Sequence, residues 1–238
     1  MNSSIFSFDH SHSEFDKLLK KYVSKGLVNY SGLMNEKTSL LNYNKSLEEV
    51  SKSEYDAFSR EEKLAFLINA YNSFTLQLIL DHYPISSIGE IGGLFKKVNL
   101  MRGTPWKKEF FTLVGEKRNL DWIEHEKLRK DFGEPRIHFA IVCASIGCPP
   151  LRAEAYVPKN INSQLESNKK VFLSDASKNS YDASKNKLSI SPIFKWFEKD
   201  FTKKGTVQEF LENEFPAKVL KEAKIEYTDY DWNLNVQK

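Results

Sequence analysis

LAFLINAYNSFTLQLILDHY, residues 64–83, presents apolar side chains on nearly every side of a helical period. A helix of this kind is packed on several faces, so we expect it at the centre of the fold. Ser59 and Glu62 precede it at capping-box spacing, in which the serine oxygen accepts from a first-turn amide and the glutamate reaches back. Pro84 cannot continue a helix. The sequence therefore predicts a buried helix over residues 60–82.

Shorter patterns on either side predict further helices and a hairpin. Residues 12–24 place apolar side chains at helical spacing, and residues 109–120 combine β-prone residues with a Gly-containing turn. Residues 84–108 are rich in glycine and predict an irregular connection. We further expect helices at 121–130, 161–174, 192–200 and 206–222, short strands at 187–191 and 224–228, and a solvated loop or hairpin at 174–187.

RIHFAIVCA, residues 136–144, is apolar on both faces of a strand, which is typical of a strand in the middle of a sheet. The elements together predict an α+β fold. We expect a helix-rich single domain over residues 12–238, built around a small central, mainly antiparallel sheet and preceded by an N-terminal tail, residues 1–11. The hydrophobic content of 40% is enough for one sizeable core.

The composition argues against several classes of partner. The 35 basic and 32 acidic residues are interspersed, so we expect no nucleic-acid ligand. No stretch approaches 18 uninterrupted apolar residues, so we expect no integral membrane contact. The chain as it stands lacks the pattern of a secretion signal, so the sequence by itself predicts a soluble, cytoplasmic protein. An exported or periplasmic protein whose leader had been removed would have the same sequence pattern.

The candidate chemistry centres on Cys143, which lies where the predicted strand ends and the loop ASIGCPP begins. Catalytic groups concentrate at such junctions. A free cysteine is also among the most buried residue types, so a core role stays open. Successive strand side chains point to opposite faces, which places His138 and Cys143 on different faces and predicts that the base for Cys143 comes from elsewhere. Cys148 lies in the loop itself, before two prolines.

The stretch DWIEH, residues 121–125, supplies the candidate base. Asp121 and Glu124 have the spacing of a variant capping box, which explains both carboxylates without catalysis. His125 lies in the first turns of the predicted helix, where the positive end of the helix dipole favours a neutral imidazole. A neutral ring is what a general base requires.

Asn69 and Asn72 are three residues apart and share one face of the central helix. Such buried amides tie down a neighbouring loop, orient a catalytic histidine or line an oxyanion site, and these alternatives stay open. His125, His138, Cys143 and Cys148 are residue types that bind zinc, but the C-x4-C spacing argues against a zinc site. We therefore expect no metal and no cofactor.

Five stretches together resemble the domain of unknown function DUF547: LAFLINAYN, LDWIEHEKLR, PRIHFAIVCASIGCPPLR, IFKWFEKDF and YDWNLN. The family's motifs map onto Asn69, Asn72, Glu124, His125, Arg136, His138, Cys143, Ser145 and Pro149. Leu67 stands where the family usually has tryptophan, a departure that affects packing more than chemistry. The resemblance implies no settled activity. It also implies that a disulfide or zinc site using both cysteines is not general to the family, because plant members often carry serine at the position of Cys148.

The leading hypothesis is a thiol-dependent hydrolase or acyltransferase of papain-like or transglutaminase-like logic, acting on an amide or related acyl bond of a small molecule or peptide. Cys143 attacks the carbonyl, His125 takes the thiol proton, and Glu124 or an asparagine orients the imidazole. Main-chain amides of residues 145–148 stabilise the oxyanion. Two alternatives stay open: a non-catalytic binding or scaffolding module, and a redox sensor that uses a bridge between Cys143 and Cys148. The oligomeric state stays open too.

Overall fold

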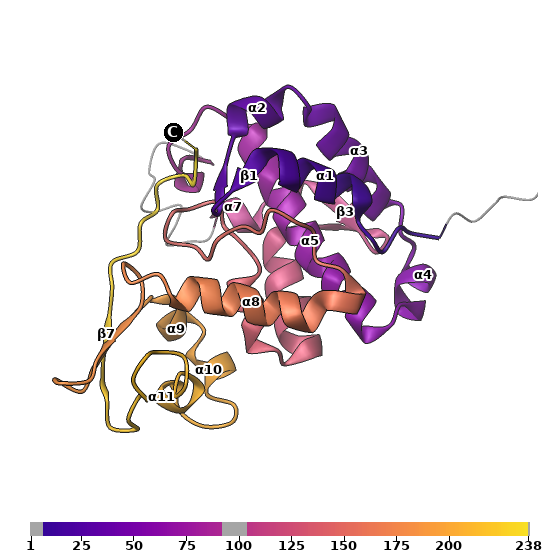
Figure 1. Cartoon of the computed structure of the whole chain (residues 1–238). Helices are drawn as coiled ribbons and strands as arrows, with labels where there is room; N and C mark the ends of the chain where they lie inside the picture. Colours follow the sequence, from indigo (N-terminus) through magenta and orange to yellow (C-terminus); the bar gives the residue numbers. More distant parts are fainter. Residues whose placement is uncertain (1–6, 92–103, 238) are drawn as a thin grey trace, which may run out of the picture.

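A single long helix, α5 (Arg60–Leu80), runs through the middle of the molecule in the computed structural model, which describes residues 7–91 and 104–237 (Figure 1). Its side chains are buried on nearly all sides. The predicted capping box is present: Ser59 Oγ accepts from the Glu62 amide at 3.2 Å, and the Ser59 amide donates to Glu62 Oε2 at 2.7 Å. The prediction of a central helix is confirmed.

Other helices surround α5. In Figure 1, α8 crosses in front of it, and α1 and α3 lie on the opposite side from the C-terminal part. The predicted helices at 12–24, 121–130 and 161–174 are confirmed. The bounds are α1 (Ser13–Tyr22), α2 (Tyr30–Met34), α3 (Lys37–Glu48), α4 (Lys52–Ala57), the π-type helix η2 (Trp122–Phe132), the short 3₁₀ segment η4 (Pro158–Asn160) and α8 (Ile161–Leu173).

Within residues 7–91 and 104–237, the strands form three small sheets. β1 (Val23–Ser24) pairs with β2 (Leu27–Val28), and β3 (Phe111–Leu113) pairs with β4 (Glu116–Arg118), both antiparallel. In the third sheet, β6 (Lys187–Ile190) lies between β5 (Ser180–Asp182), which is antiparallel to it, and β7 (Lys224–Tyr227), which is parallel. The predicted α+β class with small, mainly antiparallel sheets is confirmed, as are the hairpin at 109–120 and the strands at 187–191 and 224–228.

The prediction of a strand over residues 136–144 is wrong. Residues Pro135–Phe139 form the short 3₁₀ helix η3, and the following buried residues are irregular. Asparagine side chains supply the partners that neighbouring strands would give: Asn72 Nδ2 donates to Ala140 O at 2.9 Å, Asn72 Oδ1 accepts from the Val142 amide at 2.9 Å, and Asn168 Nδ2 donates to Phe139 O. Buried backbone groups need partners, and these amides provide them without a sheet. Strand alternation therefore does not separate His138 from Cys143.

The C-terminal third is less helical than predicted. Residues 192–200 form two short helices, α9 (Ile193–Trp196) and α10 (Glu198–Phe201), and the helix predicted over 206–222 is only α11 (Val207–Phe210). Pro216 is incompatible with a continuous helix over that stretch. Within the predicted irregular connection 84–108, the described parts hold η1 (Ile88–Glu90) and α7 (Thr104–Lys107), while residues 92–103 lie outside the described residues.

After β7 the chain runs back along one edge of the molecule to the end where α2 lies (Figure 1). This returning segment pairs with the loop that follows η3: the Ile146 amide donates to Asn233 O and the Gly147 amide to Asp231 O, each at 2.8 Å. A side chain at Gly147 would meet the Asp231 backbone at 3.0 Å, so the close approach favours glycine. The pairing brings residues 230–232 beside Cys143 and Cys148.

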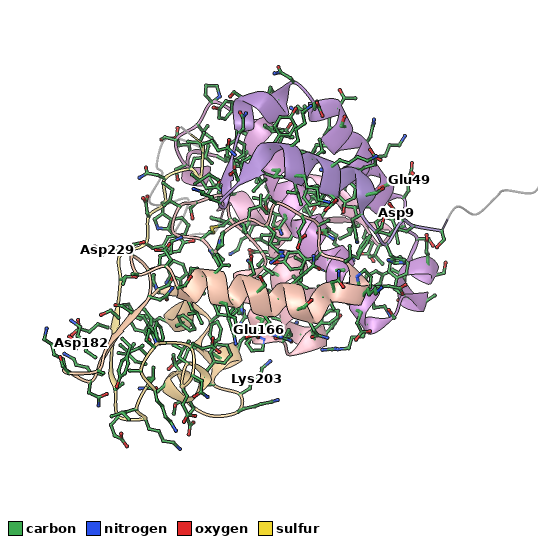
Figure 2. All side chains as sticks on the ribbon, in the orientation of Figure 1. Asp9, Glu49, Glu166, Asp182, Lys203 and Asp229 are labelled. Carbon is green, nitrogen blue, oxygen red and sulfur yellow. A yellow bond between two sulfur atoms is a disulfide. The ribbon has the colours of Figure 1, made fainter. Side chains whose placement is uncertain are left out.

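Apolar packing forms two clusters that meet near this loop. One is built on α5; the other contains Phe139 and aromatic residues of α8, α9 and α10, and Tyr230 packs against both. Charged side chains are spread over the surface rather than gathered on one face: Figure 2 labels Asp9 and Glu49 near the N-terminal end, Glu166 on α8, and Asp182 and Lys203 in the C-terminal part. No helix in the described ranges combines the length and the hydropathy needed to cross a bilayer.

Candidate functional site

A cavity of about 210 Å³ lies where the two apolar clusters meet. Its wall contains Cys143 and Cys148 together with four titratable side chains, Asp121, Glu124, His125 and His138. Aromatic rings form much of the remainder: Tyr71, Trp106, Trp196, Phe197, Tyr230 and Trp232. The three residues predicted as catalytic, Cys143, His125 and Glu124, therefore share one cavity with His138.

Cys143 and Cys148 are joined by a disulfide in the wall of this cavity. Cys143 is partly exposed, whereas Cys148 is 4% exposed. The Tyr230 hydroxyl lies 3.2 Å from Cys143 Sγ and 3.1 Å from Cys148 Sγ, and the Ser145 hydroxyl lies 3.2 Å from Cys143 Sγ. The Cys143 amide donates to Cys148 Sγ at 3.0 Å. Both sulfurs therefore lie among hydrogen-bond donors, which favour a thiolate once the bridge is opened.

His138 forms an imidazole–carboxylate pair with Asp200. Nε2 lies 2.8 Å from Asp200 Oδ2, and the ring stacks on Phe197 with centroids 4.0 Å apart. Burial lowers the pKa of His138, against the opposing effect of Asp200, so the ring is neutral near pH 7. For Asp200, burial acts to raise the pKa, but hydrogen bonds from His138 and Arg129 hold it well below its usual range. An ionised carboxylate only accepts, so Nε2 carries the proton and Nδ1 is the basic nitrogen.

His125 is held in a different way. Arg129 Nη1 lies 3.0 Å from His125 Nδ1. A guanidinium can only donate, so Nδ1 of His125 must accept and Nε2 carries the proton. His125 Nε2 lies 3.9 Å from Asp121 Oδ1. Burial lowers the pKa of His125, which keeps the ring neutral. The nitrogen that a general base needs is therefore occupied by Arg129.

Glu124 is a buried carboxyl without a capping role. The predicted capping box with Asp121 is wrong, because Asn119 Oδ1 instead accepts from the Trp122 amide at 2.8 Å and Asp121 makes no capping bond. The Tyr71 hydroxyl donates to Glu124 Oε2 at 3.4 Å. Burial, reinforced by the charge of Asp121, raises the pKa of Glu124 to about 7. Glu124 thus exchanges a proton near neutral pH inside the cavity.

Asn69 and Asn72 bind backbone rather than the histidines. Asn69 donates to Tyr156 O at 2.7 Å and accepts from the Tyr156 amide at 3.0 Å, and Asn72 holds Ala140 and Val142 as described above. Both amides fasten loops to α5. Of the two interpretations given by the sequence, these contacts correspond to the tying of loops.

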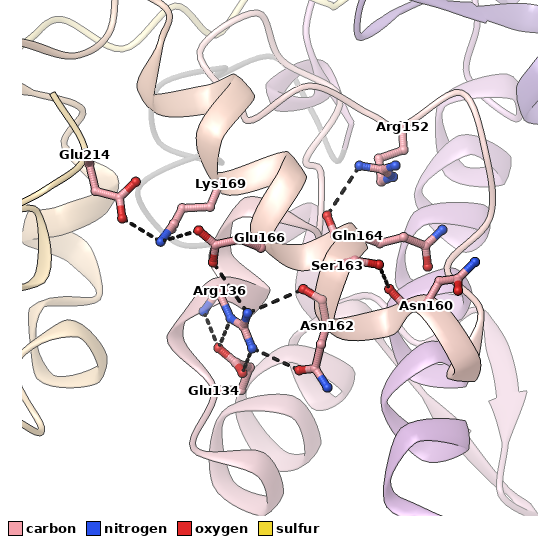
Figure 3. Close-up of polar contacts among 10 residues, drawn as sticks. All are labelled: Glu134, Arg136, Arg152, Asn160, Asn162, Ser163, Gln164, Glu166, Lys169 and Glu214. Atoms are coloured by element: carbon pink, nitrogen blue, oxygen red, sulfur yellow. Dashed lines mark hydrogen bonds and ion pairs between the residues drawn. The ribbon is translucent and has the colours of Figure 1, made fainter. Parts of the chain in front are cut away.

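Arg136 lies in an ion-pair cluster that fastens η3 to α8. Figure 3 shows its guanidinium between Glu134, Glu166 and Asn162, with Nε 2.8 Å from Glu134 Oε1. Lys169 continues the cluster by bridging Glu166 and Glu214 (Figure 3). Arg136 does not line the cavity. Its place in the family motif is explained by this cluster.

Sequence reasoning missed Trp232, which lines the cavity, and Asp200, which pairs with His138. Asp200 and Trp232 lie 62 and 94 residues beyond His138, and no spacing pattern connects them. The available signal was that IFKWFEKDF and YDWNLN, two stretches of the family resemblance, contain Trp196, Asp200 and Trp232. Among the described residues, no group of three His, Cys, Asp or Glu side chains is placed to hold a metal ion.

The match to a known family covers the middle of the chain. Comparison of the chain with curated proteins and with solved structures found no match. Residues 55–173, half of the chain, match the family described as "Protein of unknown function, DUF547". The matched region contains Cys143, His125, Glu124 and His138, whereas Asp200 and Trp232 lie beyond it. The chain belongs to the DUF547 family.

Proposed function

We propose that the reduced chain is a thiol-dependent hydrolase or acyltransferase that acts on an amide or related acyl bond. The observation that carries the proposal is that Cys143 and His138 line one cavity, and that His138 pairs with Asp200, which is not part of the lining. A thiol, an imidazole and an orienting carboxylate are the parts of a cysteine nucleophile site. In this proposal His138 replaces His125 as the base, because Nδ1 of His125 is occupied by Arg129.

The chemical steps follow from these roles. Nδ1 of His138 takes the Cys143 proton, the thiolate attacks the carbonyl carbon, and the leaving amine or alkoxide departs with the proton from the imidazolium. The resulting thioester is cleaved by water in a hydrolase or by a second nucleophile in an acyltransferase, which restores the thiol. The Tyr230 hydroxyl, 3.2 Å from Cys143 Sγ, stabilises the thiolate, and it accepts a hydrogen bond from the Ser145 hydroxyl at 3.0 Å.

Cys143 is available as a nucleophile only after the bridge to Cys148 is reduced. A dithiol reductant supplies two electrons and two protons and becomes a disulfide itself, leaving both cysteines as thiols. The proposal therefore requires activity that depends on reductant.

The matched pair Cys143→Ser and Cys148→Ser tests the proposal with p-nitrophenyl esters and aminoacyl coumarin amides as substrates. Cys148→Ser leaves Cys143 free, so we expect turnover with or without reductant. Cys143→Ser should be inactive, and His138→Gln should lose about 10²–10⁴-fold in kcat/KM. Substrate turnover by Cys143→Ser equal to that of the reduced parent would refute the proposal.

A second candidate, dithiol–disulfide exchange, is favoured by the bridge and its surroundings. Cys143 is the more exposed sulfur, and a leaving Cys148 thiolate would keep the Cys143 amide and the Tyr230 hydroxyl as donors. One thiolate of a partner dithiol would attack Cys143 and release Cys148, forming a mixed disulfide. The partner's second thiolate would then attack the partner sulfur of that mixed disulfide, so that the partner leaves as a disulfide and Cys143 and Cys148 are left reduced. Cys148→Ser separates the two candidates, because it abolishes exchange while the hydrolase retains its nucleophile.

A further inference from the structure

The tryptophans of this chain are gathered at the cavity. Three of the four, Trp106, Trp196 and Trp232, line it, and Trp122 does not. Trp196 and Trp232 stack with centroids 5.8 Å apart, and Trp106 stands at 66° to Trp232 at 6.3 Å. Tyr230 packs 4.5 Å from Trp232. The rings therefore lie at different angles to one another in the cavity wall, and aromatic walls of this kind bind cations.

Two carboxyl side chains line the same cavity as these rings, and no lysine or arginine is among the described residues that line it. Asp121 and Glu124 both come from η2, and Glu124 is 7% exposed. Arg129 lies beside the cavity, but its guanidinium is paired with Asp200 at 2.6 Å and lies over the Phe197 ring. The wall as a whole favours positive charge.

The cavity is small for a whole ligand. Its volume of about 210 Å³ lies below the roughly 300–1,000 Å³ of pockets that enclose complete drug-sized molecules. A compact terminal group of a larger molecule fits this space better than the molecule itself.

We propose that the cavity receives an alkylated ammonium group. Aromatic faces bind a bulky, weakly hydrated cation through their ring quadrupoles, and the carboxylates of Asp121 and Glu124 complete its neutralisation. The inference names the substrate class of the hydrolase proposed above and rests on that function only for the chemistry that follows binding. Binding itself needs neither a thiol nor turnover.

Choline and its uncharged carbon isostere 3,3-dimethylbutan-1-ol test the proposal on the full chain labelled with ¹⁵N at the tryptophan indoles. Choline should shift the indole signals of Trp106, Trp196 and Trp232 saturably and leave Trp122, an internal control, in place. The isostere should bind about tenfold more weakly, because it lacks the charge. Equal binding of the isostere, an equal shift of Trp122, or no saturable shift with choline would overturn the proposal.

Variants locate the site. Trp232→Leu and Asp121→Asn should each weaken choline binding several-fold, and Trp122→Phe should leave it unchanged. Asp121→Asn leaves the aromatic rings of the cavity in place, so it tests the choline site even if Trp232→Leu does not fold. An unchanged affinity of Asp121→Asn for choline would contradict the proposal. Choline binding without thiol-dependent turnover would refute the proposed function alone, and turnover without choline binding would refute this inference alone.

Discussion

The Asn72 side chain holds the segment that carries Cys143, and its removal has a calculable cost. Asn72 is 3% exposed and makes two hydrogen bonds of 2.9 Å, to Ala140 O and from the Val142 amide. In Asn72→Ala both backbone groups stay buried without partners, each at about 1–3 kcal/mol. We therefore expect the free energy of unfolding to fall by about 2–6 kcal/mol, a large share of the roughly 5–15 kcal/mol of a typical domain.

Urea unfolding followed by tryptophan fluorescence measures this loss, with Asn42→Ala as the matched control. Asn42 is an exposed residue of the helix α3, so its replacement should change the free energy of unfolding by less than about 0.5 kcal/mol. If Asn72→Ala were as stable as Asn42→Ala, residues 136–144 would have to be held by something other than the Asn72 amide. The physical reasoning about this segment would then be wrong.

Three further predictions concern titration and the disulfide. Burial, reinforced by His10, lowers the pKa of His12 from 6.5 to about 3, so His12 binds a proton less readily in the folded chain than in the unfolded one. In urea titrations, the free energy of unfolding of the parent should therefore fall relative to that of His12→Gln by roughly 1.4 kcal/mol per pH unit between pH 6.5 and 3. Burial raises the pKa of Glu124 from 4.5 to about 7, so stability is lost as pH rises between these values; Glu124→Gln should be about 3 kcal/mol more stable than the parent at pH 8 and no more stable at pH 4, by the same assay. The bridge between Cys143 and Cys148 closes a loop of sequence separation 5. Its reduction should lower the free energy of unfolding by about 2 kcal/mol, and Cys143→Ser should show no response to reductant.

The fold was predictable where local sequence determines it. The helix α5 carries its own start signal at Ser59 and Glu62, and the hairpin of β3 and β4 carries its own turn. Residues 136–144 have the apolar pattern of a buried strand, but their backbone partners come from Asn72 and Asn168, up to 70 residues away. An apolar run shows that a segment is buried, not how its amides are satisfied.

The site was predictable in its residue types but not in its pairing. Cys143, His125 and Glu124, the residues of the sequence hypothesis, line one cavity, and His138, which strand alternation would place on the other face, lines it with them. Two local interpretations failed for physical reasons. Residues 135–139 form a 3₁₀ helix instead of a strand, so His138 and Cys143 do not lie on opposite strand faces as predicted. The capping bond predicted for Asp121 is made by Asn119 instead. The partner of His138 comes from α10, 62 residues later, and only tertiary structure brings it close.

The rate at which iodoacetamide alkylates Cys143 tests the central claim most directly. Cys148→Ser leaves Cys143 as the only thiol, so the label reports one sulfur. If His138 and Asp200 activate Cys143, alkylation at pH 7 should be at least about tenfold faster than in the urea-unfolded chain, and adding His138→Gln should remove this advantage. A Cys143 that reacts only after unfolding, or equally fast without His138, would contradict the claim that this cavity contains an activated nucleophile.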